Sequence, residues 1–88
     1  MLTATYTKKF KQDIERVKKR GKNLNGLKDI LDKLLNQDKL PTKNKDHSLK
    51  GVYKDCRECH IEPDWLLIYK VITPELMLYR TGTHSDLF

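Results

Sequence analysis

Three histidines and one aspartate are the side chains of this sequence best suited to proton transfer: His47, His60, His84 and Asp64. Histidine is the only side chain whose ordinary pKa lies near neutral pH. Cleavage of RNA through its own 2′-hydroxyl needs a base for the hydroxyl proton, an acid for the 5′-oxygen and cations for the phosphorane. The four residues are therefore a candidate catalytic set for that reaction.

Two further roles stay open for the same residues. Each histidine alone also fits an ordinary role, as a loop residue, a strand-end residue or a partner of Asp64. Three histidines and a carboxylate can also bind zinc, but the short ligand spacing of typical zinc sites is missing. We therefore expect acid–base chemistry without a metal or another cofactor.

Arg80 and Lys50 are the candidate phosphate-binding residues. Side chains alternate along a strand, so Arg80 is expected on the same face as Gly82 and His84. A guanidinium at that position would pair with the scissile phosphate. Lys50 is a second candidate cation in a segment rich in Lys, Asn and Asp.

Cys56 and Cys59 form, with His60, the pattern C-x-x-C-H that is used for covalent haem attachment. That use requires export, and Met1–Phe10 has no basic segment followed by an apolar one. The pattern also lies where a strand is expected, which would place the two sulfurs on opposite faces. We expect both cysteines to be thiols in a reducing cytosol, without metal or haem.

Hydrophobic periodicity predicts a strand and two helices before these residues. Leu2–Tyr6 alternates with threonines, as in a short strand. Apolar residues then recur with helical spacing from Thr7, a candidate N-cap, to Gly21, a candidate C-cap glycine. A second helix is expected to begin near Asn23 and to end before Pro41. The short link between the helices predicts an antiparallel helical hairpin.

The second half of the chain is expected to hold a loop and an antiparallel meander. Lys39–Gly51 has no periodicity, so we expect an exposed loop that carries His47. Three runs separated by turns indicate strands: Tyr53–Ile61, Trp65–Ile72 and Leu76–Thr83. The first and third strands of a meander end at the same edge, which would bring His60 and His84 together, with Asp64 nearby.

Length and charge limit the possible architectures and partners. The chain has 88 residues, of which 38% are hydrophobic and 34% charged, which fits one folded α+β domain spanning residues 1–88. Eighteen Lys and Arg against twelve Asp and Glu give a formal charge of +6, which favours a nucleic acid or an acidic protein segment as partner. No apolar run approaches the ~20 residues of a membrane span, so we expect a cytoplasmic protein without a membrane partner.

Several blocks of the sequence, in the same order, resemble the YafQ toxins of the RelE superfamily. The blocks are Lys45–Gly51, Arg57–Glu58, His60–Trp65, Leu67–Lys70 and Arg80–Phe88. The resemblance implies a RelE-like α+β fold, in which an N-terminal strand and a helical hairpin pack on a twisted antiparallel sheet. It also implies a toxin of a type II toxin–antitoxin system that cleaves mRNA in the ribosomal A site and inhibits translation.

The resemblance further implies a partner and a set of site residues. The partner is an antitoxin of the DinJ type, which wraps the toxin and links it to operator DNA. The functional positions of the family fall on His47, His60, Asp64, His84 and Phe88. Arg80 matches a family arginine, and Glu58 stands at a position that is acidic in the family. Phe88 would either stack on a nucleobase or close the core.

Two competing functions remain open at this point. A toxin of the ParE type in the same superfamily would poison gyrase by binding, without chemistry, and would need no histidine cluster. A simple nucleic-acid-binding module would explain the charge of +6 and would leave the histidines unused. The histidines and Asp64 favour the nuclease.

Overall fold

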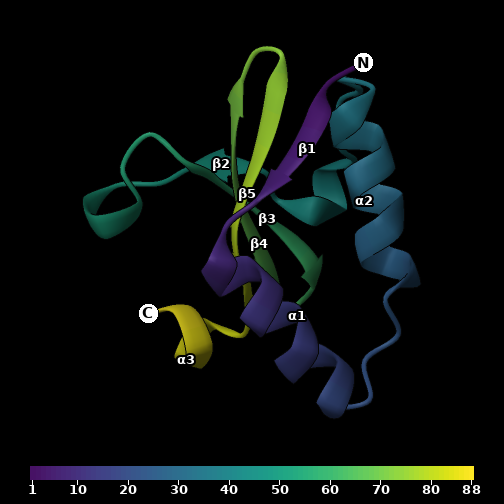
Figure 1. The fold of residues 1–88 in the computed structure, drawn as a ribbon, viewed down its shortest axis with the longest axis vertical. Helices are drawn as coiled ribbons and strands as arrows, with labels where there is room; N and C mark the ends of the chain where they lie inside the picture. The colour runs from purple at the N-terminus through teal and green to yellow at the C-terminus, as the bar shows by residue number, and fades with distance from the viewer.

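A five-stranded sheet with the order β1-β5-β4-β3-β2 forms the centre of the computed structural model, which describes residues 1–88 (Figure 1). The strands are β1 (Thr3–Tyr6), β2 (His47–Ser48), β3 (Arg57–Glu62), β4 (Trp65–Ile72) and β5 (Glu75–Gly82). The antiparallel meander β3-β4-β5 confirms the prediction. β1 joins β5 in parallel, so the complete sheet is mixed.

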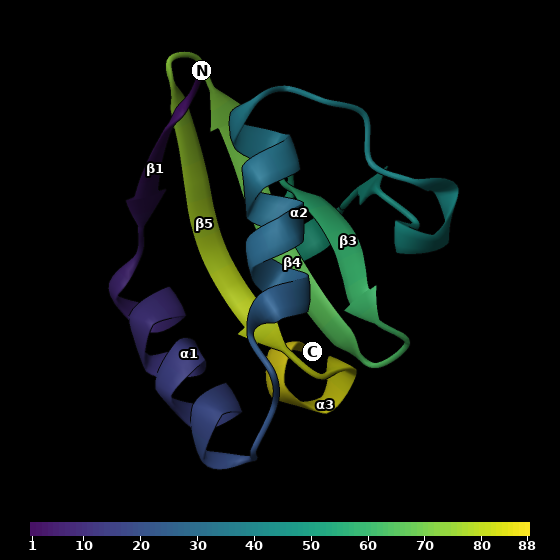
Figure 2. The ribbon, with the colours of Figure 1, turned by 90° about the vertical axis from the view of Figure 1, so that its right-hand side faces the viewer.

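Two helices cover one face of the sheet, α1 (Lys8–Lys19) and α2 (Asn25–Leu35) (Figure 2). The Thr7 hydroxyl accepts a hydrogen bond from the Phe10 amide (3.0 Å) at the start of α1, and Gly21 has a φ of +80° just after its end. Both ends confirm the sequence prediction. Gly26 lies where a Cβ atom would be 3.3 Å from Ile61 of β3, so the glycine lets α2 approach the sheet. None of the helices has the length and apolarity needed to cross a membrane.

The main core lies between the two helices and the sheet. It holds 13 buried residues, among them Trp65, Leu67 and Tyr69 of β4, which alternate along the strand. The other face of the sheet has a cluster of only four buried residues: Cys56, Leu66, Ile68 and Leu87. That cluster is covered by short elements, the 3₁₀ helix η2 (Gly51–Tyr53) and the C-terminal helix α3 (His84–Leu87). We call this second surface the helix-free face, because α1 and α2 do not cover it.

The region before β3 differs from the prediction of a plain loop. It contains the 3₁₀ helix η1 (Thr42–Asn44), the strand β2 and η2, and β3 begins at Arg57 rather than at Tyr53. Asp46 anchors this region, since it accepts hydrogen bonds from the Tyr69 hydroxyl (2.7 Å) and from Nε of Arg57 (3.1 Å). Elements this short depend on tertiary contacts, which leave no periodicity in the sequence.

Candidate active site

The strand register gathers the predicted chemistry on the helix-free face. Residues that lie opposite each other in a sheet point to the same side. Glu58 pairs with Ile68, which pairs with Arg80, and His47 of β2 pairs with Glu58. His60 lies two residues after Glu58 on β3 and therefore shares its face. His47 thus lies in β2 and not in the loop that the sequence predicted.

The three histidine rings form a row across this face. The ring centroids of His47 and His60 are 6.5 Å apart, and those of His60 and His84 are 5.9 Å apart. His47 and His84 are exposed, whereas His60 is half-buried between them. The predicted approach of His60 and His84 at one sheet edge is confirmed.

Asp64, in the turn between β3 and β4, holds the outer histidine of the row. Its Oδ1 accepts a hydrogen bond from the backbone amide of His84 (3.0 Å) and pairs with Nδ1 of the same ring (2.8 Å). These bonds from His84 lower the pKa of Asp64, so the carboxylate is ionised at neutral pH. An ionised carboxylate only accepts, so Nδ1 carries the proton and Nε2 is left for a substrate.

His47 is held at the other end of the row by the backbone. Its Nδ1 lies 2.6 Å from the carbonyl oxygen of Lys45, and a carbonyl can only accept. Nδ1 is therefore the protonated nitrogen here as well. Nε2 lies 3.9 Å from a carboxylate oxygen of Glu58. Both outer histidines thus have Nδ1 hydrogen-bonded within the protein, whereas Nε2 has no hydrogen bond.

Glu58 is a member of the site that the acid–base argument did not select. Its side chain is buried, with 5% of the residue exposed, and its Oε1 lies 3.3 Å from Nε2 of His60. Its position two residues before His60 on a strand was the signal that could have identified it. Glu58, His60 and His84 also offer ligand atoms within 4.8 Å of one another, close enough to hold a metal ion.

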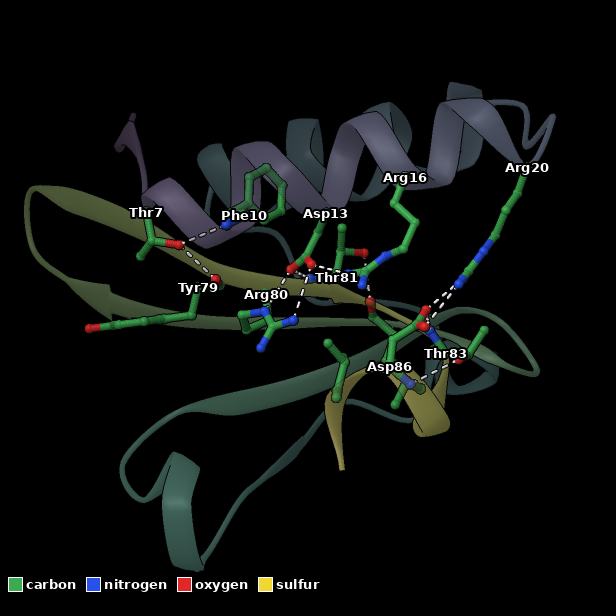
Figure 3. A network of polar contacts seen from close by, with 12 residues as sticks. Thr7, Phe10, Asp13, Arg16, Arg20, Tyr79, Arg80, Thr81, Thr83 and Asp86 are labelled. Carbon is green, nitrogen blue, oxygen red and sulfur yellow. Dashed lines mark hydrogen bonds and ion pairs between the residues drawn. The ribbon is translucent and has the colours of Figure 1, made fainter.

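Arg80 is engaged with a buried carboxylate of α1. Its Nε and Nη2 donate to the two oxygens of Asp13 (2.7 and 3.1 Å), which also accepts from the Thr81 amide (3.1 Å) and pairs with Arg16 (Figure 3). The hydrogen bonds from Arg80 to Asp13 raise the pKa of Arg80. Nη1 remains free of Asp13 and lies 3.5 Å from the hydroxyl of Tyr53. Phosphate contact by Arg80 stays a prediction, and this edge of the guanidinium is the part available for it.

The C-terminal helix α3, which the sequence analysis did not predict, positions His84. The Thr83 hydroxyl accepts from the Asp86 amide (3.1 Å), and the Asp86 carboxylate accepts from the Thr83 amide (2.9 Å). Arg20 at the end of α1 donates to both oxygens of Asp86 (2.6 and 2.9 Å), which holds the pKa of Asp86 well below its usual range. A Cβ atom at Gly82 would lie 2.8 Å from Asp86, so glycine is needed where β5 meets α3. These hydrogen bonds fix the start of α3 and therefore the position of the His84 ring.

Phe88 lies beside the histidine row, whereas Lys50 makes no polar contact with it. Phe88 is 64% exposed, and Leu87 fills the small core instead, so the interpretation of Phe88 as a core plug is wrong. The Phe88 ring lies 5.6 Å from Tyr53, edge to face, and 6.4 Å from His84. Lys50 is exposed just before η2, and no hydrogen bond or ion pair joins it to the histidines.

The two cysteines do not form a site. Cys59 belongs to the main core and Cys56 to the small cluster, so the predicted placement on opposite faces is confirmed. Burial raises the pKa of Cys59 to about 12, which keeps the thiol protonated at neutral pH. Because the two sulfurs lie on opposite faces of the sheet, they cannot hold one haem or one metal ion together.

The chain is similar to known proteins over nearly its whole length. A family model described as a bacterial toxin of type II toxin–antitoxin system, YafQ, matches residues 2–88. The mRNA interferase toxin YafQ of Escherichia coli K12 is 43% identical over 84 residues, which cover 94% of this chain and 91% of that protein.

Two solved structures are similar over the whole chain. A metal-bound toxin from Helicobacter pylori superposes with a TM-score of 0.94 at 43% identity, covering 100% of both chains. YafQ from the E. coli DinJ–YafQ complex superposes with a TM-score of 0.91 at 40% identity, covering 100% of this chain and 99% of that one. The α+β fold, the identity and the near-complete coverage agree, and the chain therefore belongs to the YafQ family of type II toxin–antitoxin toxins.

Proposed function

We propose that this protein is an mRNA endonuclease that cleaves mRNA in the ribosomal A site and thereby inhibits translation. The row of His47, His60 and His84, held at one end by Asp64, is the observation that carries the proposal. The E. coli relative is named an mRNA interferase, which supports the same activity. The net charge of +6 suits a substrate embedded in ribosomal RNA.

The proposed chemistry is a transesterification within the RNA. One histidine Nε2 removes the proton of the 2′-hydroxyl, and the 2′-oxygen then attacks the adjacent phosphorus. A second histidine donates its proton to the departing 5′-oxygen. The products are a 2′,3′-cyclic phosphate and a 5′-hydroxyl end. Arg80 and Lys50 are the proposed cations for the phosphorane, and Phe88 is the proposed stacking partner of a base.

Product analysis on ribosomes programmed with a defined mRNA tests this chemistry. We expect fragments with 2′,3′-cyclic phosphate and 5′-hydroxyl ends. Cleavage should continue in the presence of a chelator that removes transition metals and leaves ribosomal magnesium in place. Fragments with 5′-phosphate ends, or a loss of cleavage that zinc restores, would contradict the metal-independent mechanism.

A metal ion is a second candidate ligand of the same cluster. The nitrogen and oxygen donors of Glu58, His60 and His84 suit an ion such as zinc or copper, and the H. pylori relative has been solved with a bound metal. When bound, such an ion would supply a polarised water. It would also occupy histidine nitrogens that proton transfer needs, so we expect added zinc or copper to inhibit cleavage.

The proposed protein partner is a DinJ-like antitoxin, by analogy with the E. coli DinJ–YafQ complex. The basic toxin would bind an acidic segment of this antitoxin, and operator DNA would be bound only by the complex. Co-expression with the product of the adjacent gene should yield a stable complex and restore growth. A toxin that binds operator DNA by itself would contradict this arrangement.

Gyrase poisoning of the ParE type remains the alternative. It would leave the three histidines without a role, since a binding inhibitor needs no acid and base. A supercoiling assay with purified gyrase separates the two functions. We expect no inhibition at toxin concentrations that cleave ribosome-bound mRNA.

A further inference from the structure

A hollow next to the histidine row has the composition of a nucleotide-binding site. It has a volume of about 300 Å³, and its lining residues are Thr7, Lys8 and Lys9 at the start of α1, Val52 and Tyr53 of η2, and Tyr79 and Arg80 of β5. That volume is at the small end of the range for ligand sites. Three segments far apart in the sequence thus meet beside the proposed active site.

A β-bulge in β5 explains why two consecutive residues border the same hollow. Tyr69 pairs with Leu78 and Ile68 pairs with Arg80, so Tyr79 is the extra residue between them. The Tyr79 side chain packs with Tyr53 against the small cluster of the helix-free face. The Thr7 hydroxyl donates to the Tyr79 carbonyl oxygen (2.7 Å), which ties the bulge to the start of α1 (Figure 3). Bulges often redirect side chains beside active sites.

The charges around the hollow favour a polyanion. Lys8 and Lys9 are exposed and take part in no ion pair. No acidic side chain lines the hollow. Aromatic rings next to unpaired cations are what single-stranded nucleic acid requires, because bases stack on the rings and phosphates pair with the cations.

Tyr53 connects the hollow to the catalytic row. Its hydroxyl donates to the Leu87 carbonyl oxygen (3.3 Å) in α3. Its ring contacts Phe88 edge to face, and Phe88 in turn lies beside His84. A strand of RNA with its scissile phosphate at the histidines would therefore extend along Phe88 toward the hollow.

We propose that this hollow binds a nucleotide that neighbours the scissile phosphate, with its base against Tyr79 and its phosphate on Lys8 or Lys9. The inference rests on the proposed endonuclease function and adds a nucleotide subsite to the substrate contacts proposed above. An antitoxin segment is the competing occupant. The half-buried aromatic rings beside lysines without an ion pair favour the nucleotide.

A double-substitution cycle between the RNA and the protein tests the proposal. Ribosome-bound mRNAs with a single abasic nucleotide at successive positions near the cleavage site are compared for wild type and Tyr79→Leu, with Tyr79→Phe as the control that keeps the ring. For wild type we expect one position at which base removal lowers kcat/KM about tenfold. For Tyr79→Leu the same removal should have no further effect, and Tyr79→Phe should behave as wild type.

A second test needs no cleavage. Equilibrium binding of the intact and abasic RNAs is measured for the His84→Ala protein with and without Tyr79→Leu. A wild-type protein that cleaves no RNA would contradict the proposed function, and the binding cycle would still decide the inference. An equal loss for intact and abasic RNA in Tyr79→Leu would assign Tyr79 to structure and overturn the inference. A loss of antitoxin affinity without any change toward RNA would overturn it as well.

Discussion

The two faces of the sheet use alternate residues of the same strands for opposite purposes. On the face under α1 and α2, β4 contributes Trp65, Leu67 and Tyr69 to a core of 13 buried residues. On the helix-free face, the buried Leu66 and Ile68 lie beside His60 and Glu58, their partners in β3. The covered face provides most of the apolar burial, which is the main source of stability. The helix-free face can therefore hold titratable groups without loss of the fold.

The largest expected effect is a loss of cleavage activity after a substitution on the helix-free face. His84→Ala should lower the rate of mRNA cleavage by on the order of 10² to 10⁴, because it removes one of the two proton-transfer groups. The side chain is 55% exposed and its ring contacts chiefly Asp64 and the neighbouring rings, so the fold should persist. A growth assay and single-turnover cleavage measure the loss, and circular dichroism checks the fold. If the His84→Ala protein is folded and remains fully toxic, His84 is not catalytic, and the proton transfer must be assigned to His47 or His60.

The matching change on the covered face should have the reverse result. Leu67 is completely buried in the main core, and Leu67→Ala should lower the free energy of unfolding by about 2 to 5 kcal/mol through reduced burial and a cavity. The cleavage rate per folded molecule should stay close to that of wild type. Urea unfolding, combined with cleavage measured well below the transition, tests both parts. A rate defect as large as that of His84→Ala would mean that the two faces are not independent.

The same contrast explains how far the sequence predicts this molecule. α1 has a long periodic pattern and β4 a long apolar run bounded by turns, and the ends of both elements agree with the prediction within one residue or better. β2, η2 and α3 are two to four residues long and are held by partners distant in sequence, such as Tyr69 with Asp46 and Arg20 with Asp86. A pattern within a few residues cannot indicate such partners.

The candidate site follows the same rule. His60, Asp64 and His84 were predicted to meet because strand order alone brings them to one edge, and they do. The burial of Asp13 against Arg80 was missed because of its charge, although Asp13 lies three residues after Phe10 and four before Val17, on the buried face of α1. Tyr53 was placed in a strand, whereas its contact with Phe88 depends on η2 leaving the sheet.

The stability contributed by the pair of Arg20 and Asp86, where α1 meets α3, should depend on pH. The folded-state pKa of Asp86 is depressed, mainly by the hydrogen bond from Arg20. A depressed pKa contributes stability above the ordinary pKa of an aspartate, about 4, and this contribution is lost as the pH falls below that value. Asp86→Asn should therefore lower stability at pH 7 and weaken the dependence of stability on pH below about 4. Urea unfolding from about pH 7 to about pH 3 measures this, and an unchanged acid dependence would contradict the assignment.

The smallest expected effect concerns the outer surface of α1, which belongs to neither face of the sheet. Lys18 and Lys19 are exposed near the end of α1, and Lys18 has only a weak contact with Glu15 at 3.6 Å. If these lysines pair with ribosomal RNA phosphates, the variant with Lys18→Glu and Lys19→Glu should bind ribosomes less tightly. The slope of log affinity against log salt should also become shallower, by roughly one for each phosphate that the variant no longer neutralises. The free energy of unfolding should change little, because exposed helix charges contribute only tenths of a kcal/mol.

Substitution of Lys28 and Lys33 on α2 by Glu changes the charge equally on the other helix and serves as the matched control. Equal losses of ribosome affinity in both variants would indicate a general charge effect, and only a larger loss in the α1 variant supports a binding surface on that helix.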